Sequence, residues 1–208
     1  MAKIHKFQYD ITEEVANSLK ESIAIDTEAT GLQIPERDKL SLIQICDQNG
    51  NVYIIQPDRK SYKAPNIISI LENEKILKIG HYLRFDKSAL EYFLKCKMKP
   101  IFCTRTASRL CRTYSSEHGL KSLVQEFCGK KIDKRYGSSD WNKDINELSD
   151  KQLEYAANDV IFLHQIFTEL KKMLKRENRL ELFNSCMAFL DTRIKLDQSG
   201  FKFDVFEH

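Results

Sequence analysis

The chain has 208 residues, a length typical of one globular domain, and 42% of them are hydrophobic and 30% charged. This composition excludes a disordered or collagen-like chain. Lysine and arginine number 33 and aspartate and glutamate 30, so the formal net charge is +3. That balance suits a small anionic ligand and lacks the strong basic footprint of a protein that binds long nucleic acids.

The sequence has no obvious signal for membrane insertion or export. No stretch reaches the ~18 consecutive apolar residues of a membrane helix, and the segment MAKIHKFQYDITEEV has no apolar core of a signal peptide. None of the six cysteines forms a Cys-x-x-Cys pair, which disfavours a zinc ribbon or a thioredoxin-like site. We therefore expect a cytoplasmic protein with reduced, mostly buried thiols.

The first third of the chain favours strands. A short helix is expected at Thr12–Lys20, with its first residue as N-cap and an acidic first turn. Alternating and β-branched residues then predict strands at Ser22–Glu28, Leu40–Cys46 and Asn51–Gln56. An Asn-Gly pair between the last two strands predicts a hairpin turn.

The remaining two thirds alternate helices with short strands. The expected order is helix Pro65–Leu71, strand Ile76–Ile79, helix Arg84–Lys95, strand Ile101–Cys103, helices Thr104–Arg112 and Leu120–Phe127, polar loop Gly129–Asp144, long helix Asp150–Arg176 and helix Leu180–Lys195. This order predicts an α/β fold with a mixed central sheet, helices on both faces and a helical carboxy-terminal segment.

Two acidic residues, Asp26 and Glu28, lie two positions apart on a predicted central strand. The strand period of two places both side chains on one face. Like charges at that distance repel each other and a central strand solvates them poorly, so a bound cation would stabilise the pair. The alternative is an exposed strand end at which both carboxylates are solvated and bind nothing.

Further acidic residues follow on two predicted helices. Asp86 comes shortly after a parallel-type strand, where α/β sheets place their sites, or it is simply a first-turn acid favoured by the helix dipole. Tyr155 and Asp159 share one helix face, which Phe162 and Ile166 continue. A carboxylate on this partly apolar helix face costs free energy unless it is paired or bound to a metal. Alternatively, Asp159 lies at the border of the face and its carboxylate reaches water.

Together these residues supply four carboxylates and one phenol. Four hard oxygen donors without His or Cys suit Mg²⁺ or Mn²⁺ rather than zinc. Their four negative charges would neutralise two divalent cations, and two such ions ~3.5–4 Å apart are the usual arrangement for attack on a phosphodiester. Tyr155 would then orient the attacking water, or help to deprotonate it, by hydrogen bonding.

The segments around these residues resemble the three exonuclease motifs of the DEDD superfamily: IAIDTEATGL (Ile23–Leu32), IGHYLRFD (Ile79–Asp86) and YAAND (Tyr155–Asp159). The Tyr-x-x-x-Asp form resembles the DEDDy branch, which includes ribonuclease D. The resemblance implies an RNase H-like (DnaQ-like) exonuclease fold and metal-dependent 3′→5′ hydrolysis that releases nucleoside 5′-monophosphates. It assigns metal binding to Asp26, Glu28, Asp86 and Asp159, and the orientation of water to Tyr155.

Similarity to the short, single-domain nanoRNase C family extends over four further segments: CTRTASRLCRTY (Cys103–Tyr114), HGLKSL (His118–Leu123), SSDW (Ser138–Trp141) and LDQSGFKFDVF (Leu196–Phe206). That family degrades diribonucleotides and forms ring-shaped homo-octamers, so the resemblance implies both properties. About thirty residues follow the long helix, too few for an HRDC domain of the ribonuclease D kind, and we expect one exonuclease domain over residues 1–208.

Assembly into a ring would require exposed apolar residues. The carboxy-terminal segment offers four candidates within six positions, namely Phe201, Phe203, Val205 and Phe206. Alternatively, this segment folds back on its own domain.

Five residues are candidate contacts to a dinucleotide. Leu32 would pack against the bases, as the matching leucine does in similar dinucleotidases, or it is an ordinary core leucine. Ser138 and Ser139, in a loop rich in lysine, would cap a 5′ phosphate and reject longer chains, or the loop is merely solvated. Thr27 and His81 flank the predicted metal ligands, although a satisfied core histidine is the alternative for His81.

The sequence therefore predicts a metal-dependent 3′-5′ exoribonuclease that acts on diribonucleotides and short oligoribonucleotides. A ribonuclease D-like exonuclease that trims longer RNA or DNA is the alternative, which the weak net charge disfavours. A catalytically silent binding module would have lost one of the metal ligands, and none is lost here.

Overall fold

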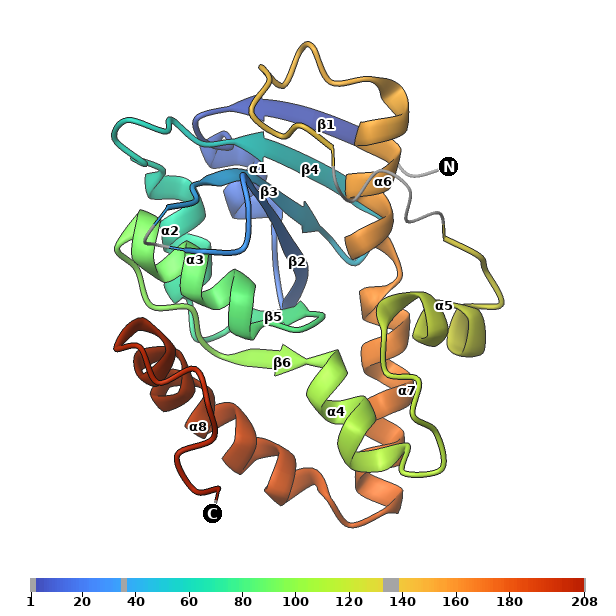
Figure 1. The fold of residues 1–208 in the computed structure, drawn as a ribbon. Coiled ribbons are helices and arrows are strands. Elements are labelled where there is room, and N and C mark those ends of the chain that lie inside the picture. Colours follow the sequence, from blue (N-terminus) through green and yellow to red (C-terminus); the bar gives the residue numbers. More distant parts are fainter. Residues whose placement is uncertain (1–2, 35–36, 133–138, 208) are drawn as a thin grey trace.

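A central mixed sheet organises the computed structural model, which describes residues 3–34, 37–132 and 139–207. Within these residues the sheet has six strands in the order β1-β4-β3-β2-β5-β6 (Figure 1). The strands are β1 (Lys3–Gln8), β2 (Ser22–Ala29), β3 (Leu40–Cys46), β4 (Asn51–Gln56), β5 (Leu77–Gly80) and β6 (Ile101–Cys103). β3 runs antiparallel to β2 and β4, and the other pairs are parallel. The predicted α/β fold with a mixed sheet is confirmed.

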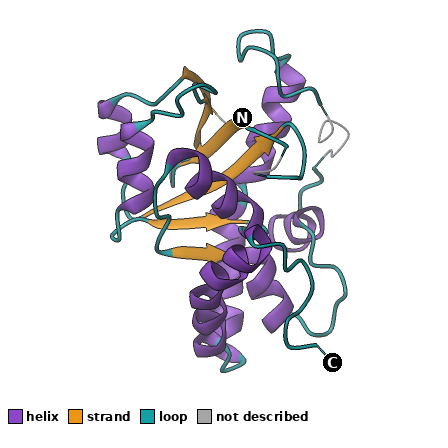
Figure 2. Ribbon diagram, turned by 60° about the vertical axis from the view of Figure 1, so that its left-hand side comes forward, coloured by secondary structure: helices purple, strands orange, loops and turns teal. Residues whose placement is uncertain are grey.

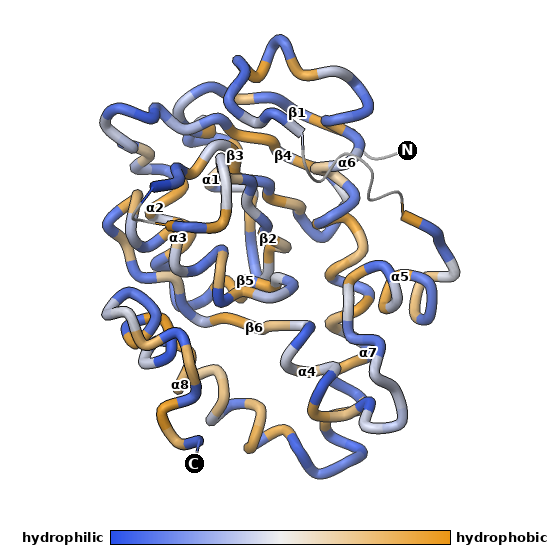
Figure 3. Tube along the Cα trace, viewed as in Figure 1, coloured by the Kyte–Doolittle hydropathy of each residue, from blue (hydrophilic) through white to orange (hydrophobic). Residues whose placement is uncertain are grey.

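Helices cover both faces of this sheet (Figure 2). They are α1 (Glu13–Ser18), α2 (Pro65–Glu72), α3 (Arg84–Leu94), α4 (Thr104–Cys111), α5 (Leu120–Cys128), α6 (Asp150–Ile161), α7 (Leu163–Arg176) and α8 (Leu180–Gln198). Successive side chains of β2 point to opposite faces of the sheet, and each face has its own hydrophobic cluster. Ala24 packs in the cluster that contains residues of α4 to α7. Ile23 and Ile25 pack in the cluster that contains residues of α2 and α3. Figure 3 shows the hydrophobic residues that run along β4 and β6.

β1 is not among the strands that the sequence predicts. Its residues, KIHKFQ, include two lysines, and every one of those described is exposed or half-buried. β1 lies at the edge of the sheet and pairs only with β4, in parallel. Edge strands are often charged because one of their sides faces water, so the hydrophobic alternation that marks central strands is weak here.

The long helix predicted for Asp150–Arg176 is wrong as a single element. The helix is interrupted at Phe162, where α6 ends and α7 begins. The backbone angles of Phe162 are φ −93° and ψ −8°. α6 packs on β2, β3 and β4, whereas α7 packs on α4, α5 and β5. One straight helix would not pack against both sets of elements. Tertiary packing therefore interrupts the helix although the sequence pattern is continuous.

Local capping signals behave as the sequence predicts. The hydroxyl Oγ1 of Thr12 accepts a hydrogen bond from the backbone N–H of Val15 at 3.2 Å and so caps α1. Ser149 begins α6 with a capping box, because its side chain and that of Gln152 each accept a hydrogen bond from the other residue's backbone N–H.

The six cysteines are free thiols. Among the helices of the described residues, none combines the length and apolar character needed to cross a membrane.

Candidate active site

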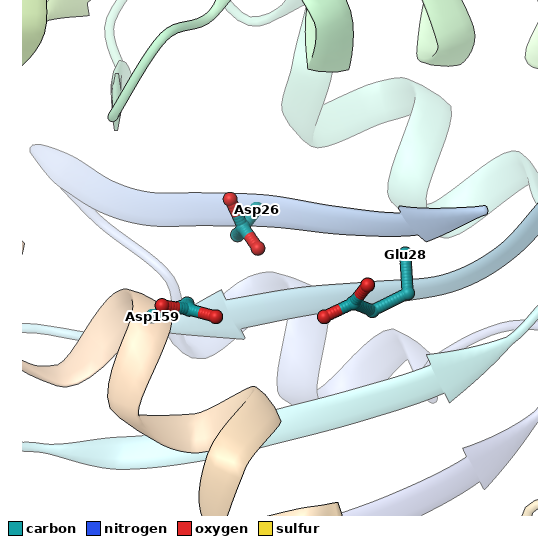
Figure 4. Close-up of side chains that lie close together, drawn as sticks. All are labelled: Asp26, Glu28 and Asp159. Atoms are coloured by element: carbon teal, nitrogen blue, oxygen red, sulfur yellow. The ribbon is translucent and has the colours of Figure 1, made fainter. Parts of the chain in front are cut away.

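Three carboxylates meet where β2 passes under α6. Asp26 and Glu28 project from the same face of β2, as the strand period predicts, and Asp159 comes from α6 (Figure 4). One carboxylate oxygen from each of the three residues lies within 4.8 Å of the other two. Residues more than 130 positions apart in the sequence therefore form one acidic cluster.

Asp86 stands beside this cluster without joining it. It lies in the first turn of α3 and is only 4% exposed. The hydroxyl of Thr27 donates a hydrogen bond of 2.6 Å to its Oδ1. Burial, together with the nearby negative charge of Asp159, raises the pKa of Asp86 to about 7. The structure thus brings three of the four predicted ligands together and holds the fourth close by.

Tyr155 lies one helical turn before Asp159 and is almost fully buried. Its ring packs against Trp141 with 6.0 Å between the centroids. Burial raises the pKa of Tyr155 above its ordinary value, and the negative charges of Asp159 and Glu28 raise it further. The phenol of the metal-free protein therefore keeps its proton at neutral pH and can donate a hydrogen bond.

All of these side chains line one cavity of about 640 Å³. This volume is in the range of small-molecule sites. The four carboxylates lie together in the cavity and make the electrostatic potential there negative. Crowded carboxylates are stable only if protons, hydrogen bonds or cations offset their repulsion. The donor set is oxygen alone, without His or Cys, which fits a hard divalent cation such as Mg²⁺ or Mn²⁺.

Leu32 is not a core leucine, because 84% of its side chain is exposed. It lies at the rim of the cavity, directly after Gly31. A Cβ on Gly31 would come within 2.4 Å of the Asp38 carboxylate, so a larger residue here would displace the Asp38 side chain. Asp38 in turn accepts a hydrogen bond from the backbone N–H of Gln33 and fixes the loop that presents Leu32.

The other predicted substrate contacts have different surroundings. His81 lines the cavity, and its Nδ1 lies 2.9 Å from the hydroxyl of Thr104. Because that hydroxyl donates to the Gly80 carbonyl, Nδ1 of His81 carries the hydrogen. Ser139 lines the cavity, while Ser138 lies outside the described residues. Thr27 also lines it, but its hydroxyl is engaged by Asp86.

Tyr82 and Phe85 line the same cavity, and the sequence did not single them out. Tyr82 is 48% exposed, and its φ of 67° is rare for a residue with a side chain. The guanidinium of Arg105 lies 5.0 Å from the centroid of its ring. The available signal was an aromatic residue two positions after the end of β5, because binding residues often lie in loops next to regular elements.

Residues 5–175 match the sequence model of the 3′-5′ exonuclease family. DNA polymerase I of Aquifex aeolicus is 34% identical over an alignment of 205 positions, which covers 88% of this chain and 32% of that protein. Ribonuclease D of a Shewanella strain is 33% identical over 147 residues, 68% of this chain and 35% of that protein. The chain thus matches about a third of the length of these relatives.

Solved structures of Brucella melitensis NrnC are similar over the whole chain. The structure bound to pGG is 38% identical with a TM-score of 0.92 and covers 100% of both chains. The structure with bound Mg²⁺ is 38% identical with a TM-score of 0.90 and covers 99% of both chains. The likeness confirms the RNase H-like exonuclease fold.

The raised pKa of Asp86 predicts how the metal-free protein responds to pH. The pKa is about 7 when folded and about 3.9 when unfolded, so the folded state binds the extra proton between these values. The stability contributed by protonated Asp86 is present below about pH 4 and is lost as the pH rises through about 7. Asp86→Asn stays neutral, so we expect it to stabilise the chelator-treated protein more at about pH 8 than at about pH 5.

Urea unfolding of both proteins at the two pH values measures this difference. Asp150→Asn, at an exposed position in the first turn of α6, is the matched control. It should change the free energy of unfolding by the same amount at both pH values. An equal effect of Asp86→Asn at both pH values would contradict the assignment.

Proposed function

The chain belongs to the 3′-5′ exonuclease family, and from that premise we propose that it is a metal-dependent exoribonuclease that hydrolyses diribonucleotides and short oligoribonucleotides to nucleoside 5′-monophosphates. The observation that carries this proposal is the meeting of Asp26, Glu28 and Asp159 within 4.8 Å. The similarity over the whole of both chains to a structure solved with bound pGG supports a short substrate.

Asp26, Glu28, Asp86 and Asp159 would hold two divalent cations, Mg²⁺ or Mn²⁺. When bound, such cations activate a water and stabilise the charge that develops on the phosphate and on the leaving 3′ oxygen. The solved structure of Brucella melitensis NrnC with Mg²⁺ supports the choice of cation. Asp86 is the ligand that must lose a proton near neutral pH, because its pKa is about 7 in the metal-free protein.

Tyr155 would orient the attacking water. Its phenol is protonated, because burial and neighbouring carboxylates raise its pKa, so it donates a hydrogen bond to the water oxygen. Packing against Trp141 and the rigid helix α6 hold the ring in place. Tyr155 then contributes by positioning, which accelerates a reaction by keeping the nucleophile in line with the phosphorus.

Leu32, His81 and Ser139 would bind the substrate around the scissile phosphate. The exposed side chain of Leu32 offers an apolar surface against which a base can pack. Ser139 lines the same cavity and supplies a hydroxyl for a ribose or a phosphate, and His81 and Thr27 line it as well. His81, Thr27 and Ser138 are proposed as further contacts. A cavity of about 640 Å³ accommodates a few nucleotides rather than a long strand.

We also propose that the chain forms a homo-oligomer in the cytoplasm, an octameric ring as in nanoRNase C. Large apolar side chains support self-association, because Phe203 and Phe206 are 62% and 80% exposed. Part of this segment is tied to α8, since Arg193 donates to the carbonyl oxygens of Phe201 and Phe203. The free thiols agree with a reducing compartment.

The length preference is tested with RNAs of two to seven nucleotides under identical Mg²⁺ conditions. We expect the dinucleotide to be cleaved fastest, because its whole length fits the cavity. The rate constants come from product time courses. The proposal fails if dinucleotides stay intact while longer RNAs are digested, which is the behaviour expected of a ribonuclease D-like trimming enzyme.

The metal-ligand assignment is tested by Asp159→Asn, which removes the charge but keeps the shape. We expect a loss of hydrolysis greater than the roughly 100-fold caused by removing a residue that only supports a ligand. Circular dichroism and urea unfolding should show a folded protein. Asp150→Asn, on the same helix but exposed and outside the cavity, should retain full activity. Normal turnover by Asp159→Asn would refute the assignment.

The role of Tyr155 is tested by Tyr155→Phe, which removes only the hydroxyl. We expect kcat to fall by about 10² to 10³, within the range for loss of a group that assists proton transfer or orients water. The affinity for Mn²⁺ should stay unchanged, because the phenol is not a ligand. A parallel loss of kcat and Mn²⁺ affinity would argue against this role.

A further inference from the structure

A buried glutamine in the middle of β3 has unsatisfied hydrogen-bonding groups. Gln44 is 0% exposed. Neither its Nε2 nor its Oε1 has a hydrogen-bond partner among the residues that the structure describes. Buried amides nearly always make hydrogen bonds, because burial removes the water that would otherwise bind them. The side chain therefore needs a partner that the folded chain alone has not supplied.

Gln44 is the direct neighbour of a proposed metal ligand. In the antiparallel ladder of β2 and β3, Gln44 is in register with Asp26. Directly opposed residues on such strands project from the same face, with Cβ atoms about 4.5–5.5 Å apart. The flanking residues Leu42 and Cys46 belong to the hydrophobic cluster that contains α6. Gln44 therefore points into the layer between sheet and α6, beside the Asp26 carboxylate.

The chemistry of the two side chains is complementary. A carboxylate accepts hydrogen bonds, and the Nε2 of an amide donates them without adding charge to an already acidic site. A carboxylate that binds a cation through one oxygen leaves the other free to accept such a bond. Because Gln44 is fully buried, it cannot touch substrate and can act only through its neighbours.

We propose that Gln44 is a positioning residue for Asp26, whose carboxylate accepts a hydrogen bond from Nε2 of Gln44 when its other oxygen binds the cation. This inference rests on the proposed function, in which Asp26 is a metal ligand. The bond fixes the orientation of the Asp26 carboxylate and satisfies the buried donor at the same time. Metal binding and the hydrogen bond therefore support each other.

The experiment measures metal binding by the full chain carrying Gln44→Met, which keeps the length of the side chain but removes the donor. We expect the affinity for Mn²⁺ to fall about tenfold, at the lower end of the effect of removing a residue that orients a ligand. Free Mn²⁺ is counted by electron paramagnetic resonance. The free energy of unfolding without metal should be unchanged or higher, because an unsatisfied buried amide is replaced by an apolar group.

Two reference variants separate the possible outcomes. Ile54 is in register with Gln44 on β4, one strand further from Asp26, and lies in the same cluster. Ile54→Val should lower stability slightly and leave Mn²⁺ affinity unchanged, as a pure packing change does. Asp26→Asn should abolish the Mn²⁺ site. If Asp26→Asn binds Mn²⁺ normally, the metal assignment itself fails, which is distinct from failure of the role of Gln44.

The role of Gln44 is overturned if Gln44→Met binds Mn²⁺ like the wild type while Asp26→Asn does not, whatever happens to stability. Should Gln44→Met fail to fold, a crystal structure of the wild-type chain with Mn²⁺ decides the question. A separation of about 2.7–3.2 Å between Nε2 of Gln44 and an oxygen of Asp26 supports the bond, and one beyond about 3.5 Å overturns it.

Discussion

The repulsion among carboxylates is the constraint around which this molecule is organised. Asp26, Glu28 and Asp159 lie within 4.8 Å of one another, and Asp86 lines the same cavity. Such crowding is unfavourable unless protons or cations offset it. Burial, together with the nearby negative charge of Asp159, raises the pKa of Asp86 in the metal-free chain, so that a proton on Asp86 takes the place of a positive charge. Cation binding and proton release at this site are therefore linked.

The rest of the fold keeps these charges together. β2 lies inside the sheet between β3 and β5. Its Asp26 and Glu28 positions pair with β3, and its first residues, Ser22 to Ala24, pair with β5, so the sheet holds the strand in place. The capping box at Ser149 fixes the start of α6, which carries Tyr155 and Asp159 over the strand. The break at Phe162 lets α6 follow the sheet while α7 packs on other helices. Rigidity at the site thus comes from elements of regular structure rather than from loops.

Apolar and aromatic side chains lie at the rim of the cavity that holds the acidic cluster. Leu32 is exposed directly after Gly31, where a Cβ would displace the Asp38 side chain, and Tyr82 is exposed with a strained backbone. In the function proposed above, such exposed groups would suit the flat bases of a short substrate, since each can cover one base. The buried Gln44 beneath the cluster would complete the arrangement by orienting one ligand.

Local geometry alone related several of the proposed site residues to one another. The period of two placed Asp26 and Glu28 on one face, and the i, i+4 spacing did the same for Tyr155 and Asp159. Those relations depend only on backbone geometry within one element, so the sequence by itself determined them. Tertiary packing decided the rest: the meeting of Asp159 with β2, the burial of Asp86 against Thr27, the break at Phe162 and the edge strand β1. Contacts between distant segments depend on how whole elements pack, and no local pattern encodes them.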